Sequence, residues 1–132
     1  MNLNSTKGTA LVTGASTGIG AIYADRLARR GYDLILVARN RERLDALAQR
    51  ISTDTGRKVD VIAADLNDKA GLASVEAVLT SDIPLTLLVN NAGVGATAPL
   101  LASDIDSLTS MINLNVTALT RLTDAAVTAT CK

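Results

Sequence analysis

The segment TGASTGIG, residues 13–20, joins an apolar run to an amphipathic one through three glycines. Residues 9–12 before it are short, apolar and partly β-branched, which is typical of a buried parallel strand. After it, apolar residues recur at helical spacing at Ile19, Ile22, Tyr23 and Leu27, and Gly31 is placed to end the helix. The first N–H groups of a helix have no partner within it, and the helix dipole is positive there. The pattern therefore predicts an anion-binding turn between a strand and a helix.

Each glycine of this turn has a separate expected role. Gly14 allows a tight exit from the strand, Gly18 lets the backbone approach a pyrophosphate, and Gly20 lets the helix pack close to the sheet. No lysine followed by serine or threonine comes after Gly20, which disfavours a nucleoside-triphosphate loop. A dinucleotide site is favoured, with a glycine-rich turn that binds nothing as the alternative. The expected contacts here are Gly14, Ser16, Thr17, Gly18, Ile19 and Gly20.

The composition indicates one globular domain and excludes several classes of site. The 132 residues are 48% apolar without Phe or Trp, so Leu, Val, Ile and Ala must form the core. Thirteen basic residues balance thirteen acidic ones, which predicts no nucleic-acid partner. The single cysteine, Cys131, and the absence of histidine argue against a disulfide scaffold and a zinc site. With no long apolar run and no apolar centre near the N-terminus, we expect a cytoplasmic protein without a membrane partner.

The rest of the chain alternates strand-like and helix-like segments. Apolar runs at 33–38, 59–64 and 85–89 predict three further strands. Helical patterns follow them, around Leu44–Ile51, over 68–79 and from Asp104 nearly to the end. This βαβαβαβα order predicts an α/β fold, a doubly wound Rossmann-type parallel sheet of four strands in the order 3-2-1-4. Residues 1–132 would form a partial dinucleotide-binding domain whose apolar fourth strand lies at an open edge.

The end of the second strand bears on the choice of cofactor. In such sheets an acidic residue there favours the free ribose hydroxyl of NAD, whereas an arginine accommodates the 2′-phosphate of NADP. Here the strand is followed by Arg39, with Arg41 and Arg43 close by and no carboxylate at the spot. NADP(H) is therefore favoured over NAD(H). The alternative is that these arginines only form the solvated start of a helix.

Four motifs in this order resemble the N-terminal half of the short-chain dehydrogenase/reductase family. They are Thr13-Gly14-x-x-x-Gly18-x-Gly20, Asp65 after the third strand, Asn90-Asn91-Ala92-Gly93 after the fourth, and Asn115 in the last helix. The resemblance implies that the glycine turn holds the pyrophosphate, that Asp65 with Leu66 borders the adenine, and that Asn91, Ala92 and Gly93 border the cofactor. Asn115 would be the family's catalytic asparagine, which holds a water in a proton relay; Asn113 is the competing assignment.

The resemblance also implies an activity, hydride transfer between NADP and a small carbonyl or alcohol substrate. That chemistry uses a Ser and a Tyr-x-x-x-Lys pair. The only tyrosines here, Tyr23 and Tyr32, are followed four residues later by Leu27 and Leu36. We therefore expect the catalytic half to be absent and this chain alone to be inactive.

Other functions and an assembly are also considered. The alternatives are a non-catalytic dinucleotide-binding module or sensor and, less favoured by the motifs, another Rossmann-type binder such as a methyltransferase. An association of identical chains, through the last helix or the exposed edge of the fourth strand, is expected as well.

Overall fold

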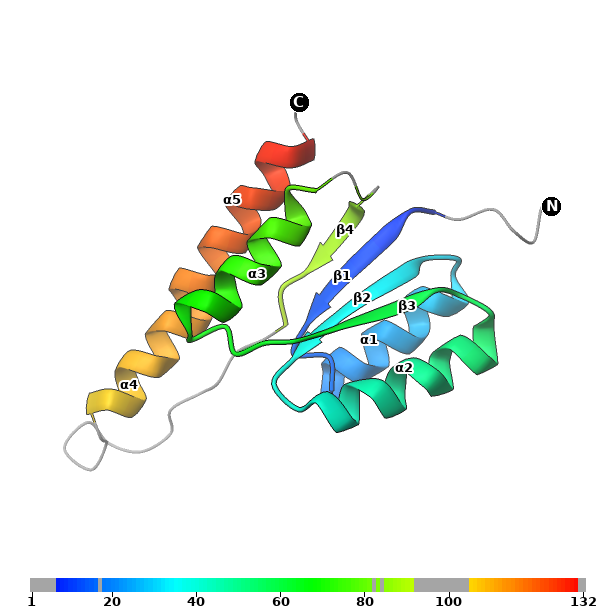
Figure 1. The fold of residues 1–132 in the computed structure, drawn as a ribbon, viewed down its shortest axis with the longest axis horizontal. Coiled ribbons are helices and arrows are strands. Elements are labelled where there is room, and N and C mark those ends of the chain that lie inside the picture. Colours follow the sequence, from blue (N-terminus) through cyan, green and yellow to red (C-terminus); the bar gives the residue numbers. More distant parts are fainter. Residues whose placement is uncertain (1–6, 17, 82, 84, 92–104, 131–132) are drawn as a thin grey trace.

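A computed structural model describes residues 7–16, 18–81, 83, 85–91 and 105–130 (Figure 1). Strands and helices alternate along this part of the chain. In order, the elements are β1 (Thr9–Thr13), α1 (Gly18–Arg29), β2 (Asp33–Ala38), α2 (Arg41–Thr55), β3 (Val59–Ala63), α3 (Lys69–Leu79), β4 (Leu85–Val89), α4 (Ile105–Ile112), the π-helical segment η2 (Asn113–Ala118) and α5 (Leu119–Thr130).

The four strands form one parallel sheet in the order β3-β2-β1-β4, as predicted. Thr13 is in register with Val37, and Val37 with Ile62, so the first three strands end level with one another. Val12 pairs with Val89, which brings the end of β4 to the same edge. The turns that follow the strands therefore gather along one edge of the sheet.

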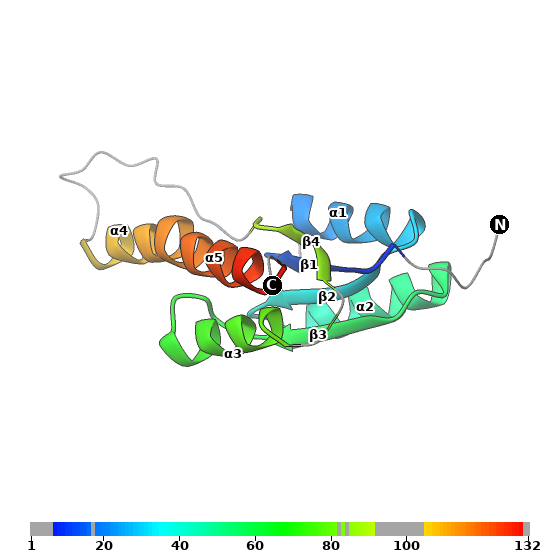
Figure 2. The same ribbon diagram turned by 90° about the horizontal axis from the view of Figure 1, so that it is seen from above.

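Helices cover both faces of the sheet and bury two aliphatic clusters. On one face Ala24 and Ala28 of α1 and Leu44 and Ile51 of α2 pack against even-numbered residues of β1 and β2. On the other face, Leu72, Val75 and Leu79 of α3 pack with Leu122 of α5. Figure 2 shows β4 between α1 and α5, so both layers extend to the end of the sheet. Aliphatic and alanine side chains thus supply the core, as the composition predicts.

Helix α1 buries its small residues rather than its larger apolar ones. Its buried residues are Gly20, Ala24 and Ala28, which are spaced four apart, and the burial of Gly20 agrees with its expected close packing. Ile19, Ile22 and Tyr23, which recur at helical spacing in the sequence, are 63%, 58% and 48% exposed and do not face the core. The face of α1 with small side chains packs on the sheet because small residues let the helix approach the sheet closely. The larger residues therefore point away from the sheet.

The last helix is not one regular α-helix. The π-helical segment η2 separates α4 from α5, and its wider turn shifts the phase of the residues that follow. Of the apolar residues that the helical pattern of this segment places together, Leu122 is buried, whereas Ile105, Ile112, Val116 and Leu119 are more than 40% exposed. Ala118, Ala125 and Ala126 are buried as well. Uninterrupted helical periodicity therefore predicts the buried face of this region only in part.

Candidate cofactor site

The turns after β1, β2, β3 and β4 lie at one edge of the sheet because the strands are parallel and end nearly level. They contribute Gly14, Arg39, Asp65 and Asn91 respectively. In open parallel sheets, ligands bind outside this carboxyl edge. The structure thus brings together residues that lie up to 77 positions apart in the sequence.

The glycine turn is held in shape by its backbone. Gly14 and Gly18 have φ angles of +63° and +58°, which glycine adopts without strain. The N–H of Ala15 donates to the carbonyl of Val37 at 3.2 Å, which attaches the turn to β2. Ser16 is half-buried and Ile19 is exposed at the start of α1. The turn therefore presents its backbone and the N-terminus of α1 at the sheet edge.

The surroundings of Gly18 fit a ligand that approaches the backbone. Among the described residues, no atom lies within 4 Å of the position that a Cβ at Gly18 would occupy. A side chain there would fill open space directly over the turn. The open space beside Gly18 and the N–H groups of the first helical turn, which have no partner within the helix, suit the binding of a phosphate.

Gly20 has the close contact that its expected role requires. A Cβ added at Gly20 would overlap the carbonyl oxygen of Gly14 and lie 2.7 Å from Nδ2 of Asn91. The absence of a side chain lets α1 pack directly on the turn. Gly20 is thus needed for packing, whereas Gly18 borders open space.

Thr13 connects the glycine turn with the turn after β4. Its hydroxyl is buried, accepts a hydrogen bond from the N–H of Asn91 at 3.0 Å and donates to the carbonyl of Val89 at 3.4 Å. The side-chain amide of Asn91 donates to the carbonyl of Gly14 at 3.3 Å. These bonds fix two loops into one unit. In the sequence Thr13 stands out only as part of the glycine motif, although a polar residue at the end of a buried strand is a detectable signal of such a role.

The end of β2 presents exposed arginines. Arg39 follows the strand and is exposed, and Arg41 lies 3.6 Å from the carboxylate of Asp45. Asn40 caps α2, since its Oδ1 accepts a hydrogen bond from the N–H of Arg43 at 3.1 Å. Helix α2 therefore begins at a fixed point next to Arg39.

The turn after β3 is a compact polar loop. Oδ1 of Asp65 accepts a hydrogen bond from the N–H of Asn67 at 2.9 Å, and Leu66 is buried. A Cβ at Gly71 would overlap the carbonyl oxygen of Asp65. Gly71, which looks from the sequence like a weak point in a helix, instead lets α3 pack against this loop.

Asn115 lies within η2, and it is half-buried whereas Asn113 is exposed. The neighbouring α5 is attached to the sheet edge by Asn90, whose Nδ2 donates to the hydroxyl of Thr123 at 3.0 Å. The difference in burial favours Asn115 over Asn113 as the inward-facing residue. Sequence periodicity gave no sign of the π-helical turn.

Three expected cofactor contacts, Thr17, Ala92 and Gly93, lie outside the described residues. Within the part of the chain that is described, no group of acidic or cysteine side chains could hold a metal ion. In the same ranges, no helix has the length and apolarity needed to cross a bilayer.

The charged pairs whose pKa values shift lie on helices. A hydrogen bond from Arg29 to Asp25 raises the pKa of Arg29, and one from Arg121 to Glu76 raises the pKa of Arg121. Both shifts further favour the protonated, positively charged form that an arginine already has at neutral pH. Neither arginine is therefore a candidate acid or base for catalysis.

Comparison with known proteins identifies the family. The sequence matches the family described as short chain dehydrogenase over residues 8–131. The chain belongs to the short-chain dehydrogenase family. The resemblance seen in the sequence is thus confirmed at the level of the family.

Solved structures of family members share this fold. A bulky-bulky ketone specific alcohol dehydrogenase from Comamonas testosteroni is 44% identical with a TM-score of 0.91, over 94% of this chain and 50% of that one. A short-chain dehydrogenase from Sphingobium yanoikuyae in complex with NADPH is 48% identical with a TM-score of 0.88, over 90% and 47% of the two chains.

Curated relatives are longer still. A very-long-chain 3-oxoacyl-CoA reductase of Vanderwaltozyma polyspora is 37% identical over 116 residues, 86% of this chain and 33% of that protein. Human 17-beta-hydroxysteroid dehydrogenase type 3 is 36% identical over 118 residues, 86% and 37% of the two. The chain spans about half the length of these solved structures and about a third of these curated relatives.

Proposed function

We propose that this chain binds NADP(H) at the carboxyl edge of its sheet and is the cofactor-binding part of an oxidoreductase. The complete protein would interconvert a small carbonyl compound and an alcohol. The bound nicotinamide would supply or accept the hydride. The observation that carries this proposal is the glycine turn, whose backbone is open at Gly18 and fixed by Thr13 and Asn91.

The residues proposed to hold the cofactor follow from their positions along this edge. The turn from Gly14 to Gly20, with Ser16 and Ile19, would receive the pyrophosphate on backbone N–H groups. Asp65 and Leu66 after β3 would border the adenine. Asn91 would act mainly by fixing the glycine turn through its bond to Gly14. Thr17, Ala92 and Gly93 remain predictions from the family motifs.

The preference for NADP over NAD rests on Arg39. It is exposed directly after β2, where a carboxylate would favour NAD. Arg41 is partly engaged by Asp45 at 3.6 Å, which makes Arg39 the better candidate for a 2′-phosphate. A family member from Sphingobium yanoikuyae, 48% identical, was solved with NADPH, which supports the same choice.

Catalysis by the complete protein would need groups beyond those identified here. Within residues 1–132, neither tyrosine is followed by a lysine four positions later. Of the catalytic residues, we propose that this chain contributes Asn115, because it lies half-buried in the π-helical segment. We propose that this chain alone is inactive and that the catalytic half lies elsewhere. Sequencing the coding region downstream of Lys132 for a serine and a Tyr-x-x-x-Lys motif tests this.

The alternative, a dinucleotide-binding module or sensor without catalysis, uses the same site. A coding region without the Tyr-x-x-x-Lys motif, in a chain that still binds NADPH, would favour it. The cytoplasmic location and the absence of nucleic-acid and membrane partners, expected from the composition, remain predictions that fractionation of cells and a nucleic-acid binding assay check.

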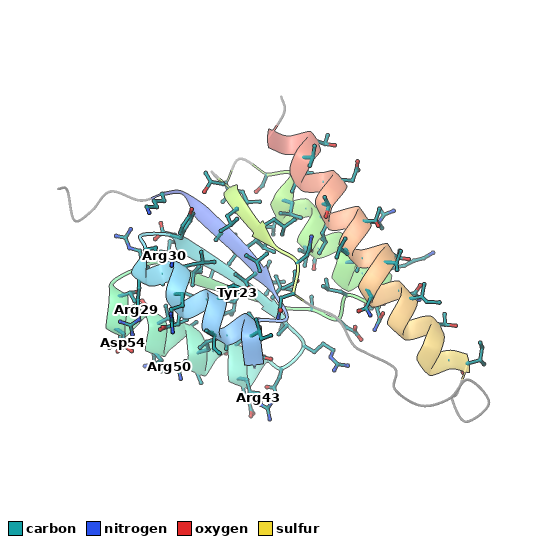
Figure 3. All side chains as sticks on the ribbon, turned by 180° about the vertical axis from the view of Figure 1, so that it is seen from behind. Tyr23, Arg29, Arg30, Arg43, Arg50 and Asp54 are labelled. Atoms are coloured by element: carbon teal, nitrogen blue, oxygen red, sulfur yellow. The ribbon has the colours of Figure 1, made fainter. Side chains whose placement is uncertain are left out.

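Calorimetric titration of NADPH and NADH tests the binding proposal. The wild-type chain is compared with Arg39→Ala and with Arg50→Ala, a matched change of another exposed arginine further along α2 (Figure 3). Arg39→Ala removes a charge-assisted hydrogen bond to the 2′-phosphate, so we expect it to weaken NADPH binding by roughly tenfold or more. Arg50→Ala should leave NADPH binding unchanged, and neither variant should change NADH binding. Equal NADPH affinities for all three proteins would remove Arg39 from the site. No binding of either cofactor to the wild type would contradict the proposed function.

A further inference from the structure

Asn90 and Asn91 follow β4 directly, and their side chains lie on opposite faces of the sheet. This is the alternation that an extended chain imposes on successive residues. Nδ2 of Asn91 donates to the carbonyl of Gly14 at 3.3 Å, on the face that α1 covers. Nδ2 of Asn90 donates to the hydroxyl of Thr123 in α5 at 3.0 Å, on the other face. Two adjacent residues therefore connect the glycine turn with α5 across the edge of the sheet.

The hydroxyl of Thr123 extends this connection to the start of α5. It accepts the hydrogen bond from Asn90 and donates to the carbonyl of Leu119, one turn earlier, at 2.7 Å. Leu119 is the first residue of α5 and the cap of η2, and its N–H donates to the carbonyl of Val116 within η2. The bond from Asn90 therefore holds the junction at which the π-helical segment ends and α5 begins.

The buried face of η2 and α5 alone does little to prevent these helices from sliding along the sheet. Its buried residues are Ala118, Leu122, Ala125 and Ala126. Ridges of side chains that fit into grooves fix the position of a packed helix, and alanine methyl groups form only shallow ridges. Polar bonds hold the two flanks of α5 instead. Arg121 forms a two-pronged pair with Glu76 of α3, and Thr123 binds Asn90.

We propose that Asn90 and Thr123 are positioning residues that fix the place of Asn115 relative to the glycine turn. Asn115 lies half-buried in η2, just before the junction that these two residues hold. A shift of that junction would rotate Asn115 about the helix axis, because residues of one helix move together. This role rests on the proposed function, in which Asn115 is the catalytic asparagine and the glycine turn holds the cofactor. Asn90 and Thr123 would act through η2, not by contact with the reacting groups.

A role in stability alone predicts a different result from a positioning role. If the bond between Asn90 and Thr123 only stabilised the fold, its loss would lower the free energy of unfolding and leave Asn115 in its native surroundings. If the bond positions η2, its loss changes the surroundings of Asn115 in the folded protein. The side-chain amide of Asn115 reports that difference directly.

Nuclear magnetic resonance of the isotopically labelled chain tests the positioning role. Thr123→Val removes the acceptor for Asn90 and keeps the shape of the side chain, whereas Thr123→Ser keeps the hydroxyl. Thr120→Val is the matched control, because Thr120 is also exposed on α5 but lines the groove toward α3. We expect Thr123→Val to shift the side-chain amide resonances of Asn115 and to speed hydrogen exchange of the η2 amides at least tenfold. Thr123→Ser and Thr120→Val should stay close to the wild type.

Asn90→Ala tests the other partner of the bond. It should reproduce the effects of Thr123→Val, and the double variant should change the exchange rates less than twofold further, because the two residues form one interaction. Unchanged Asn115 resonances and exchange in Thr123→Val, an equal change in Thr120→Val, or additive effects in the double variant would overturn the proposal. If Asn90→Ala does not fold, Thr123→Val against Thr123→Ser decides.

The measurements on η2 use the chain without cofactor. A wild-type chain that does not bind NADPH therefore contradicts the proposed function, whereas an Asn115 that does not respond to Thr123→Val contradicts the positioning role. The two failures are seen in different experiments.

Discussion

The hydroxyl of Thr13 lies 3.0 Å from the backbone nitrogen of Asn91, a residue 78 positions later in the chain. This hydrogen bond joins the end of the first strand to the turn after the fourth. The amide of Asn91 in turn binds the carbonyl of Gly14. The shape of the glycine turn is thus set partly by the turn after the neighbouring strand β4, which is distant only in sequence.

Replacing Thr13 with valine should destabilise the fold although the two side chains have similar shape. The change removes both hydrogen bonds of the hydroxyl, whereas the N–H of Asn91 can still donate to the carbonyl of Val89 at 3.2 Å, so the loss is that of ordinary hydrogen bonds, about 0.5–1.5 kcal/mol. Urea unfolding followed by circular dichroism measures the loss. Thr13→Ser, which keeps the hydroxyl, should retain most of the stability. Thr86→Val, which removes an exposed hydroxyl bond to Lys7, should have a smaller effect, and equal losses at both threonines would contradict this account.

Gly20→Ala should destabilise the chain and weaken cofactor binding together. The added methyl group overlaps the carbonyl of Gly14 and must push α1 away from the turn. Overpacking of this kind costs about 1–3 kcal/mol. Chemical unfolding and an NADPH titration of the same preparation give both effects. A variant with unchanged stability would show that α1 does not pack on the turn as described.

Gly18→Ala should mainly weaken the binding of NADPH. No described atom lies within 4 Å of the added methyl group, so its effect on stability comes from the positive φ angle, about 1–3 kcal/mol. Gly56→Ala is the matched control, because Gly56 also has a positive φ and open surroundings but ends α2 away from the turn. We expect similar stabilities for the two variants but weaker NADPH binding for Gly18→Ala alone. Equal NADPH affinities would exclude contact between the ligand and Gly18.

Two substitutions of Asn40 distinguish the effect of capping α2 from the effect on the choice between NADPH and NADH. Asn40→Ala removes the cap of α2 and should cost about 0.5–2 kcal/mol. Asn40→Asp keeps the cap but adds a carboxylate beside Arg39, which should repel the 2′-phosphate of NADPH. We expect near wild-type stability and a lower ratio of NADPH to NADH affinity for Asn40→Asp, measured by parallel titrations. An unchanged ratio would place the 2′-phosphate elsewhere.

The strand order and the glycine turn were predictable because their signals are local and strong. Buried parallel strands appear in a sequence as short apolar runs. The predicted runs at residues 33–38 and 85–89 have the same bounds as β2 and β4. Right-handed crossovers then leave few possible topologies. The motif spacing indicated the family as well, and the family comparison confirms it.

The faces of the helices were harder to predict. In α1 the larger residues Ile19, Ile22 and Tyr23 form a helical stripe, yet the closer packing of Gly20, Ala24 and Ala28 decides which face is buried. Apolar periodicity cannot distinguish a core face from an unpartnered apolar flank.

The remaining features depend on contacts between distant residues. The π-helical turn that contains Asn115 breaks the period on which sequence analysis relies. The bonds from Thr13 to Asn91 and from Asn90 to Thr123, and the close approach of Gly71 to Asp65, arise only when the sheet assembles. Such contacts leave little trace in local composition.

The central claim is that the backbone from Gly14 to Gly20 receives the pyrophosphate of NADP(H). Its most direct test is a titration of the isotopically labelled chain with NADPH, in which the amide resonances are followed by nuclear magnetic resonance. We predict that the amides of Gly14, Gly18 and Gly20 shift most, together with that of Arg39. Shifts confined to other regions, such as the α3 and α5 residues Ala77 and Thr128 that line a groove between these helices, or no shifts at saturating NADPH, would contradict the claim.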